Sequence, residues 1–165
     1  MTTARAAVTE LEADFAAAVG GAHVSPQVDR YLTDLTEHPP GTADLVVRPA
    51  TADEVVAVMQ IAARHGLPVT PVVAGYNVAG IAIPEAGGVV LDLTRLDRIL
   101  EVDDDAMYML LEPGVTFGQL KDHLDRHHPD LVYTYPFAPP FTSVVANALL
   151  DGLNNLSLRH GAMGQ

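Results

Sequence analysis

Hydrophobic positions in the first 40 residues predict one helix followed by an irregular stretch. Residues 3–19 carry apolar side chains at helical spacing, and the glycine pair at 20–21 would end that helix. From residue 24 to 40 the spacing is less regular, so we expect no more than a short helix over residues 28–35. The His-Pro-Pro-Gly run at 38–41 would break whatever element precedes it.

A strand, a helix and a second strand are predicted next. Residues 45–49 are largely apolar and β-branched and end at a proline, which is typical of a short strand. Thr51 and Glu54 then have the spacing of a capping box, and an apolar stripe continues until Gly66. The apolar run 69–74 would return as a strand, which gives a β-α-β unit whose crossover is expected to be right-handed.

The remaining pattern predicts short strands and one more helix. Thr116 and Gln119 form a second capping-box pattern in front of a helix over residues 117–127. Strands are expected over 89–93, 96–102, 107–111 and 131–135, with an acidic turn at 103–105 and a proline-rich loop at 136–140.

The run from Thr70 to Pro84 places a glycine-containing loop directly after an apolar strand. Small residues at 75–80 remove side chains from one side of a turn, so several backbone N–H groups can point at one phosphate anion. A tight strand-to-strand turn explains the same glycines, and the residues alone leave both interpretations open. The dinucleotide fingerprint G-x-G-x-x-G is absent and no helix follows, which argues against a Rossmann fold.

Composition excludes several classes of function. The formal charge of −12 opposes sequence-independent binding to nucleic acid or to anionic membranes. No apolar run approaches the roughly 20 residues that a membrane-spanning helix needs, and the N-terminus does not resemble a signal peptide. The absence of cysteine excludes disulfides and thiol chemistry. We therefore expect a cytoplasmic protein that binds neither nucleic acid nor membranes.

Two clusters of potential metal ligands are incomplete. Three consecutive aspartates at 103–105 lack the alternating spacing of a calcium loop, which favours a solvated turn. His123 and His127 stand four residues apart on one helical face, where two histidines could hold zinc, but no third ligand is evident. We therefore predict no metal site.

Five stretches in this order resemble the FAD-binding domain of the vanillyl-alcohol oxidase/4-cresol dehydrogenase (PCMH-type) flavoprotein superfamily, in its N-terminal part only. They are 47–55, 71–80, 89–93, 111–120, and 147–152 with 157–161. The resemblance implies an α+β fold, a PCMH-type FAD-binding domain with small mixed β-sheets flanked by helices and incomplete without a partner chain. Residues 1–44 would then form an N-terminal helical extension, and residues 45–165 the N-terminal portion of the FAD-binding domain.

The resemblance also implies FAD as the cofactor and assigns residues to it. The pyrophosphate would be wrapped by main-chain N–H groups of Ala74, Gly75, Tyr76, Asn77, Val78, Ala79 and Gly80. The adenosine side would lie against Pro113, Gly114 and Val115. The phosphates and the flavin would be flanked by Pro139, Pro140, Thr142, Ser143, Asn147 and Gly152. The isoalloxazine end would lie near Arg159, His160 and Gly161.

Two departures from the family bear on function. Many members carry a histidine linked covalently to the flavin in the first loop, and its absence from residues 75–80 argues against linkage from this loop. The 4-cresol branch has a Tyr-Thr-Pro-Tyr-Gly stretch near the flavin, where this chain has residues 156–161, and that difference argues against a phenolic substrate.

The resemblance implies a small FAD-binding subunit of a split flavin-dependent oxidoreductase, either an oxidase or a dehydrogenase. Hydride would pass from a small organic substrate to flavin N5. Family members are several hundred residues long, so a second polypeptide would complete the FAD domain and supply the substrate cap and the catalytic residues. Until that partner binds, apolar surface at 144–146 and 149–150 would be exposed. The alternative is a non-catalytic scaffold or binding subunit that keeps the fold without FAD.

Overall fold

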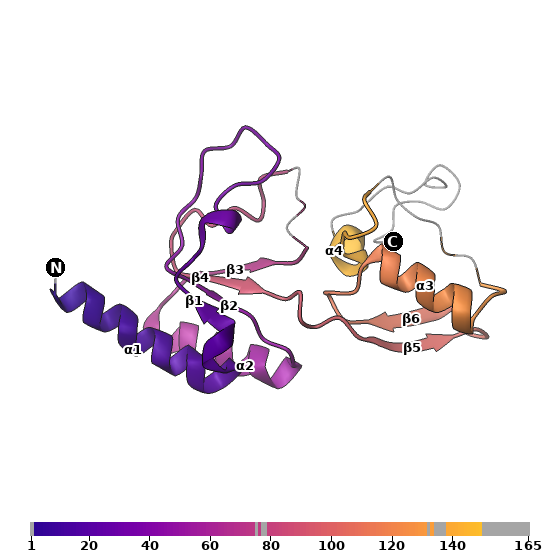
Figure 1. Ribbon diagram of the computed structural model, residues 1–165, viewed down its shortest axis with the longest axis horizontal. Coiled ribbons are helices and arrows are strands. Elements are labelled where there is room, and N and C mark those ends of the chain that lie inside the picture. Colours follow the sequence, from indigo (N-terminus) through magenta and orange to yellow (C-terminus); the bar gives the residue numbers. More distant parts are fainter. Residues whose placement is uncertain (1, 75, 77–78, 132, 134–137, 150–165) are drawn as a thin grey trace. The chain divides into compact units, whose positions relative to one another are not determined.

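The structure is a computed structural model that describes residues 2–74, 76, 79–131, 133 and 138–149. The chain forms two compact units, Met1–Arg95 and Leu96–Gln165 (Figure 1). Each unit has its own hydrophobic core, and each is described by itself below.

The first unit is built on a four-stranded sheet in the order β1-β2-β4-β3. Strand β1 pairs antiparallel with β2, whereas β2 and β3 both run parallel to β4. The predicted β-α-β unit is therefore present, but β4 lies between its two strands. The bounds of the strands are β1 Val24–Ser25, β2 Leu45–Val47, β3 Val69–Val72 and β4 Val89–Asp92.

Side chains alternate between the two faces of this sheet, as the pleat requires. On one face the central strands pack with helices α1 (Thr2–Val19) and α2 (Ala52–His65), which run along the same side of the sheet in Figure 1. Phe15 and Val58 are fully buried there. On the other face Val46 and Val90 pack with Tyr31, the last residue of the 3-10 turn η2 (Asp29–Tyr31). The predicted short helix over 28–35 is thus a single 3-10 turn.

Helix α2 begins and ends as its sequence predicts. The Thr51 hydroxyl accepts the Glu54 N–H, and Gly66 closes the helix in the left-handed conformation. The Glu54 carboxylate reaches back to the N–H of Ala50 at 2.7 Å, one residue before the N-cap. A further 3-10 turn, η1 (Gly21–His23), follows α1.

The second unit combines a two-stranded antiparallel sheet with two helices. Strands β5 (Ile99–Asp103) and β6 (Tyr108–Leu111) pair with each other, and helix α3 (Phe117–His127) starts at a complete capping box between Thr116 and Gln119. Helix α4 (Val144–Leu149) follows. The buried core of this unit is Val115, Phe117, Leu120, Leu124 and Val144.

Two expectations differ from the structure. Leu131 and Tyr133 belong to no strand, and both pack against the core of the second unit; the remaining positions of the strand predicted at 131–135 lie outside the described residues. Val144 is 4% exposed, so the prediction of an apolar surface at 144–146 was wrong for this residue, because it packs with Val115 and Leu120. Leu149 is 79% exposed, as predicted, and Leu150 lies outside the described residues.

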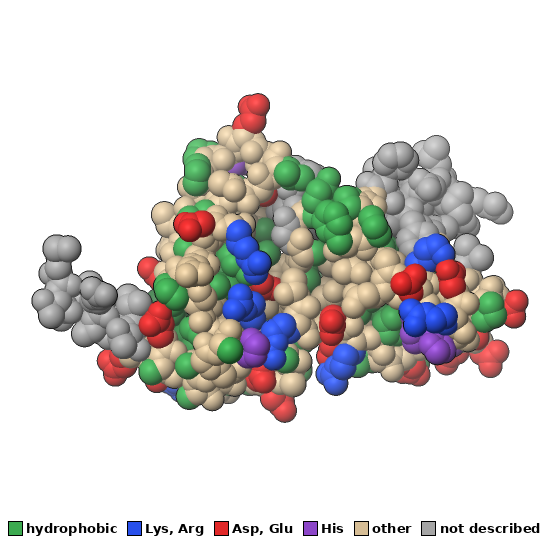
Figure 2. Space-filling model, in the orientation of Figure 1, with side chains coloured by type: hydrophobic (Ala, Val, Ile, Leu, Met, Phe, Trp, Pro, Cys, Tyr) green, Lys and Arg blue, Asp and Glu red, His purple; other side chains and the backbone are tan. Residues whose placement is uncertain are grey.

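The acidic surface and the lengths of the helices can be compared with the sequence-based expectations about charge and membrane spans. Acidic side chains are spread over the face shown in Figure 2, in keeping with the net charge of −12. Within the described ranges, no helix has both the length and the apolar character required to cross a bilayer. The proposed division of the chain at residues 44 and 45 stays a prediction, although α1 packs into the same core as β2.

Candidate functional site

Strand β3 leads into the predicted pyrophosphate loop through a left-handed turn. Ala74 has φ 59°, one of two non-glycine residues with positive φ among those described. The left-handed conformation costs an L-residue about 1–2 kcal/mol, because its Cβ comes close to the following carbonyl oxygen. Alanine has the smallest side chain that carries a Cβ. The extended backbone of β3 therefore ends within two residues of Val72.

At the other end of the same loop, Gly80 is held by two side chains from an earlier segment. Its N–H donates to Asp34 Oδ2 at 2.8 Å. Its φ is +73°, and a Cβ at this position would stand 2.5 Å from the His38 ring. A side chain at position 80 would therefore be strained and would also clash with His38.

Asp34 accepts further hydrogen bonds within its own segment. Its Oδ1 accepts the N–H of Thr36 at 2.8 Å and also the Thr36 hydroxyl proton. These donors, the Thr36 hydroxyl foremost, hold the pKa of Asp34 below its ordinary value. The carboxylate is therefore ionised at neutral pH, when it accepts the Gly80 N–H.

A hollow of about 280 Å³ lies beside Gly80 in the first unit. Its walls come from two segments, and Gly41 and Pro84 approach closely where these meet, since a Cβ on Gly41 would stand 2.2 Å from the Pro84 carbonyl oxygen. The lining residues are His38, Pro39, Pro40, Gly41, Thr42, Gly80, Ile83 and Glu85.

In the second unit, the segment before α3 and the segment before α4 are joined by hydrogen bonds. The Ser143 hydroxyl donates to the Pro113 carbonyl at 2.6 Å, and the Val144 N–H donates to the Val115 carbonyl at 3.0 Å. Thr142 donates through both its N–H and its hydroxyl to the Pro139 carbonyl. The structure thus brings together residues that the sequence places about 30 positions apart.

Asn147 carries a buried polar atom that no described residue satisfies. Its N–H donates to the Ser143 carbonyl at 3.2 Å, which is the helical bond of α4. Its side-chain oxygen is buried and has no hydrogen-bond partner among the described residues. A buried acceptor that stays unsatisfied costs about 1–3 kcal/mol. A ligand with a hydrogen-bond donor beside α4 would satisfy this oxygen, which is the respect in which the residues present fit a polar ligand.

Three further predicted site residues lie within the described ranges, and seven lie outside them. Tyr76 is 44% exposed, and Ala79 is also exposed. Gly114 donates its N–H to the Leu96 carbonyl at 2.6 Å. The predictions that lie outside the described residues are Gly75, Asn77, Val78, Gly152, Arg159, His160 and Gly161.

The histidines of α3 form a cluster but no complete metal site. The rings of His123 and His127 have centroids 4.8 Å apart, as the helical spacing predicts. Burial, with the neighbouring His127, lowers the pKa of His123. Where the chain is described, no group of three or more histidine, cysteine, aspartate or glutamate side chains could hold a metal ion.

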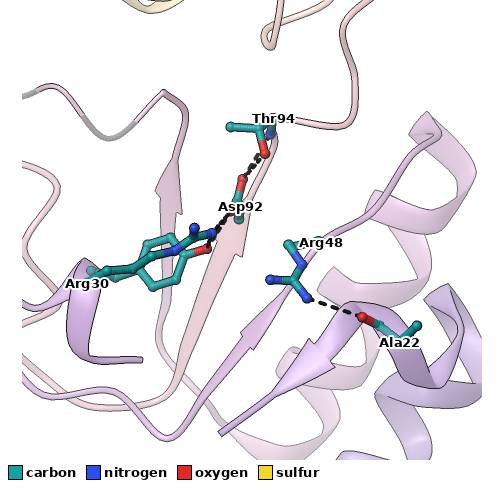
Figure 3. A network of polar contacts seen from close by, with 6 residues as sticks. Ala22, Arg30, Arg48, Asp92 and Thr94 are labelled. Carbon is teal, nitrogen blue, oxygen red and sulfur yellow. Dashed lines mark hydrogen bonds and ion pairs between the residues drawn. The ribbon is translucent and has the colours of Figure 1, made fainter. Parts of the chain in front are cut away.

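A buried carboxylate at the end of β4 organises a polar network in the first unit (Figure 3). Asp92 is 2% exposed, and its Oδ2 accepts the Tyr31 hydroxyl at 2.5 Å and Arg30 at 3.2 Å. Its Oδ1 accepts the N–H of Thr94 at 3.0 Å and the Thr94 hydroxyl. Because all these donors converge on one buried carboxylate, the network fixes η2 against the sheet.

Sequence reasoning missed the roles of Asp34 and His38. The Asp-x-Thr pattern at 34–36 is a local turn signal. Nothing local indicates that Asp34 also accepts a bond from a glycine 46 positions further along the chain.

Comparison with known proteins identifies the family. A family model described as an FAD binding domain matches residues 43–165. A 1'-carboxy-chondrochloren decarboxylase from Chondromyces crocatus is 34% identical over 142 residues, which cover 82% of this chain and 26% of the relative. The flavoprotein subunit of 4-cresol dehydrogenase (hydroxylating) from Pseudomonas putida is 30% identical over 118 residues, which cover 70% of this chain and 22% of the relative. The chain thus spans about a quarter of the length of these relatives.

Solved structures show the same fold. A p-cresol methylhydroxylase with bound substrate is 27% identical, with a TM-score of 0.75 over 88% of this chain and 30% of that one. A 4-ethylphenol oxidase from Gulosibacter chungangensis has a TM-score of 0.74 at 22% identity over 88% of this chain and 29% of that one. The PCMH-type fold and the FAD cofactor predicted from the sequence are confirmed. The chain therefore belongs to the FAD-binding domain family of flavoproteins and forms part of a PCMH-type domain.

Proposed function

We propose that this chain is the FAD-binding part of a flavin-dependent oxidoreductase that acts on a small organic substrate. The observation that carries the proposal is the match of residues 43–165 to the FAD-binding family. The unsatisfied Asn147 side-chain oxygen supports it, because a cofactor could supply the missing hydrogen bond.

The residues proposed to hold FAD form two groups. The loop group consists of residues 74–80, and this loop would surround the pyrophosphate. The second group would contact the adenosine side, the phosphates and the flavin, and consists of Pro113, Gly114, Val115, Pro139, Pro140, Thr142, Ser143, Asn147, Gly152, Arg159, His160 and Gly161. Within this second group, the bond from Ser143 to Pro113 fixes the two segments against each other.

The chemistry divides between the cofactor and the protein. Bound FAD supplies an acceptor, at N5, for the hydride that leaves the substrate. The described residues would bind and orient the cofactor: Asn147 offers a side-chain amide from within α4, and Ser143 ties the start of that helix to the segment before α3. We place substrate activation outside this chain, on residues of a further polypeptide.

That further polypeptide would complete the FAD domain and supply the substrate cap. The chain spans 26% and 22% of the decarboxylase and dehydrogenase relatives, so most of their sequence has no counterpart here. The Pseudomonas putida relative is itself described as a flavoprotein subunit. Leu149 at 79% exposure offers apolar surface to such a partner.

A second candidate is a scaffold subunit that keeps the fold without FAD. One observation favours it: the Gly80 N–H, at the end of the predicted phosphate loop, already donates to the Asp34 carboxylate. In this view the loop is a structural turn held by Asp34.

Anaerobic reduction of bound flavin tests the oxidoreductase directly. The full-length protein, coexpressed with the product of the neighbouring reading frame, is expected to be yellow. Its flavin absorbance should bleach without oxygen when one of a panel of substrates is added, including the 4-cresol and D-lactate indicated by the relatives' names. A correctly assembled but colourless complex would contradict the proposal and favour the scaffold.

A further inference from the structure

Asp34 lies in an irregular segment before the sheet, yet it is bonded to the last residue of the predicted pyrophosphate loop. We propose that Asp34 is a positioning residue that anchors this loop, and that Gly80 serves as the anchor point rather than as a phosphate-binding amide. The inference rests on the proposed function, because it assigns a role in holding FAD.

The Asp34 carboxylate uses its two oxygens for two different segments. Asp34 Oδ2 accepts the Gly80 N–H, while Oδ1 accepts two donors from Thr36. The Thr36 bonds fix the rotamer of Asp34, so Oδ2 stays directed at the loop. An N–H bond to an ionised carboxylate is about twice as strong as a bond between neutral groups. The segment at 34–36 is therefore suited to hold a backbone position 46 residues away.

His38 packs against the Cα of Gly80. The His38 ring occupies the space that a Cβ would take, with its Cδ2 and Nε2 atoms 2.5 and 2.8 Å from that position. Asp34 thus fixes the direction of the N–H, and His38 covers the Cα. Both side chains come from one short segment, so this segment sets the position of the loop's end.

The Gly80 N–H is already occupied by the Asp34 carboxylate, which disfavours a phosphate at the same position. The Gly80 amide has a single proton, and that proton points at an anion. A phosphate that used the same amide would have to displace Asp34 while approaching a like charge, which is unfavourable at short range. Gly80 therefore contributes to cofactor binding through the position it gives the loop.

The test compares near-isosteric substitutions in the full-length protein with its partner. Asp34→Asn keeps a side-chain oxygen that can accept the Gly80 N–H, whereas Asp34→Leu has a similar shape and no acceptor. Glu37→Ala is the matched control, because it removes one negative charge from an exposed position in the same segment. Two quantities are measured: the hydrogen-exchange rate of the Gly80 amide and the dissociation constant of FAD. Circular dichroism confirms that each variant is folded, and Asp34→Ala serves if the leucine variant is not.

We expect Asp34→Leu to accelerate exchange at Gly80 and to weaken FAD binding, each about tenfold, because a charge-assisted bond is lost. Asp34→Asn should stay within about threefold of the wild type, since a neutral acceptor remains, and Glu37→Ala should match the wild type. Unchanged exchange and unchanged FAD affinity in Asp34→Leu would overturn the inference, as would faster exchange without weaker binding. A folded wild-type complex that binds no FAD would instead overturn the proposed function.

Discussion

At the scale of single residues, the buried Asp92 carboxylate is the centre of a polar network in the first unit. Tyr31, Arg30 and Thr94 all donate to it. Tyr31 is buried, whereas Thr94 is exposed and the Arg30 side chain is 67% exposed. Burial is the main cause that raises the pKa of the Tyr31 hydroxyl, and the hydrogen bond to Asp92 raises this pKa further. A tyrosine hydroxyl is already protonated at neutral pH, so the raised pKa extends this bond into the alkaline range. Its stabilising contribution is present below the ordinary tyrosine pKa and is lost as the pH rises through the folded-state pKa.

Removing the Tyr31 hydroxyl should destabilise the first unit. Tyr31→Phe is expected to lower the free energy of unfolding by about 2 kcal/mol at neutral pH, because a buried charge loses a donor. Arg30→Met is the comparison and should cost less, about 1 kcal/mol, because the guanidinium is 67% exposed and the buried Asp92 keeps Tyr31 and Thr94 as donors. Urea unfolding of both variants provides the comparison. A larger loss for Arg30→Met than for Tyr31→Phe would contradict this description of the network.

Prediction from sequence succeeded for residues whose partners are local. Thr51 and Thr116 cap their helices because the capping-box spacing encodes the contact within four residues. The bond from Gly80 to Asp34 has no such local signal. The unsatisfied oxygen of Asn147 could not be foreseen either, because it depends on burial within the folded unit.

At the scale of elements, the spacing of apolar residues predicted the positions of most helices and strands but not the order of the strands in the sheet. Helices α1, α2 and α3 and strands β2, β3, β4 and β6 lie where the spacing of apolar residues predicts them. Strand β4 lies between β2 and β3 because strands far apart in the sequence pair with each other. The local spacing of apolar residues predicts a strand but not its neighbours in the sheet. Strand β1 was missed because it has two residues, too few to show an alternation.

An ion pair joins Glu112, the residue after β6, to Arg98, the residue before β5, and we expect it to link the stability of the second unit to pH. Glu112 accepts the Arg98 backbone N–H at 2.9 Å and the Arg98 guanidinium at 2.6 Å. The guanidinium bond is the main reason that the pKa of Glu112 lies below its ordinary value. Since the folded-state pKa is depressed, the contribution is present above the ordinary glutamate pKa and is lost as the pH falls through the folded-state pKa.

Glu112→Gln should therefore reduce the loss of stability in acid. We expect urea midpoints measured from neutral pH down through the acid range to fall less steeply for Glu112→Gln than for the wild type. Glu10→Gln removes an exposed carboxylate on α1 and should keep the wild-type slope. Equal slopes for Glu112→Gln and the wild type would show that this ion pair does not link stability to pH.

At the scale of the whole molecule, the chain is a partial PCMH-type domain made of two compact units. The ordered set of short motifs was sufficient to predict the family and its cofactor, because five stretches in one order are more specific than any one of them alone. The substrate could not be predicted from these residues. Most of the length of the relatives has no counterpart here, and we propose that substrate contacts lie in that remainder.

Calorimetric titration of FAD into the flavin-free full-length complex, with Asn147→Ala alongside, tests the central claim most directly. We predict one FAD per chain and about tenfold weaker binding for Asn147→Ala, because a buried amide would lose its bond to the cofactor. Gln27→Ala, which removes an exposed side-chain amide, should bind as the wild type does. A folded complex that takes up no FAD would contradict the claim that this chain holds the flavin.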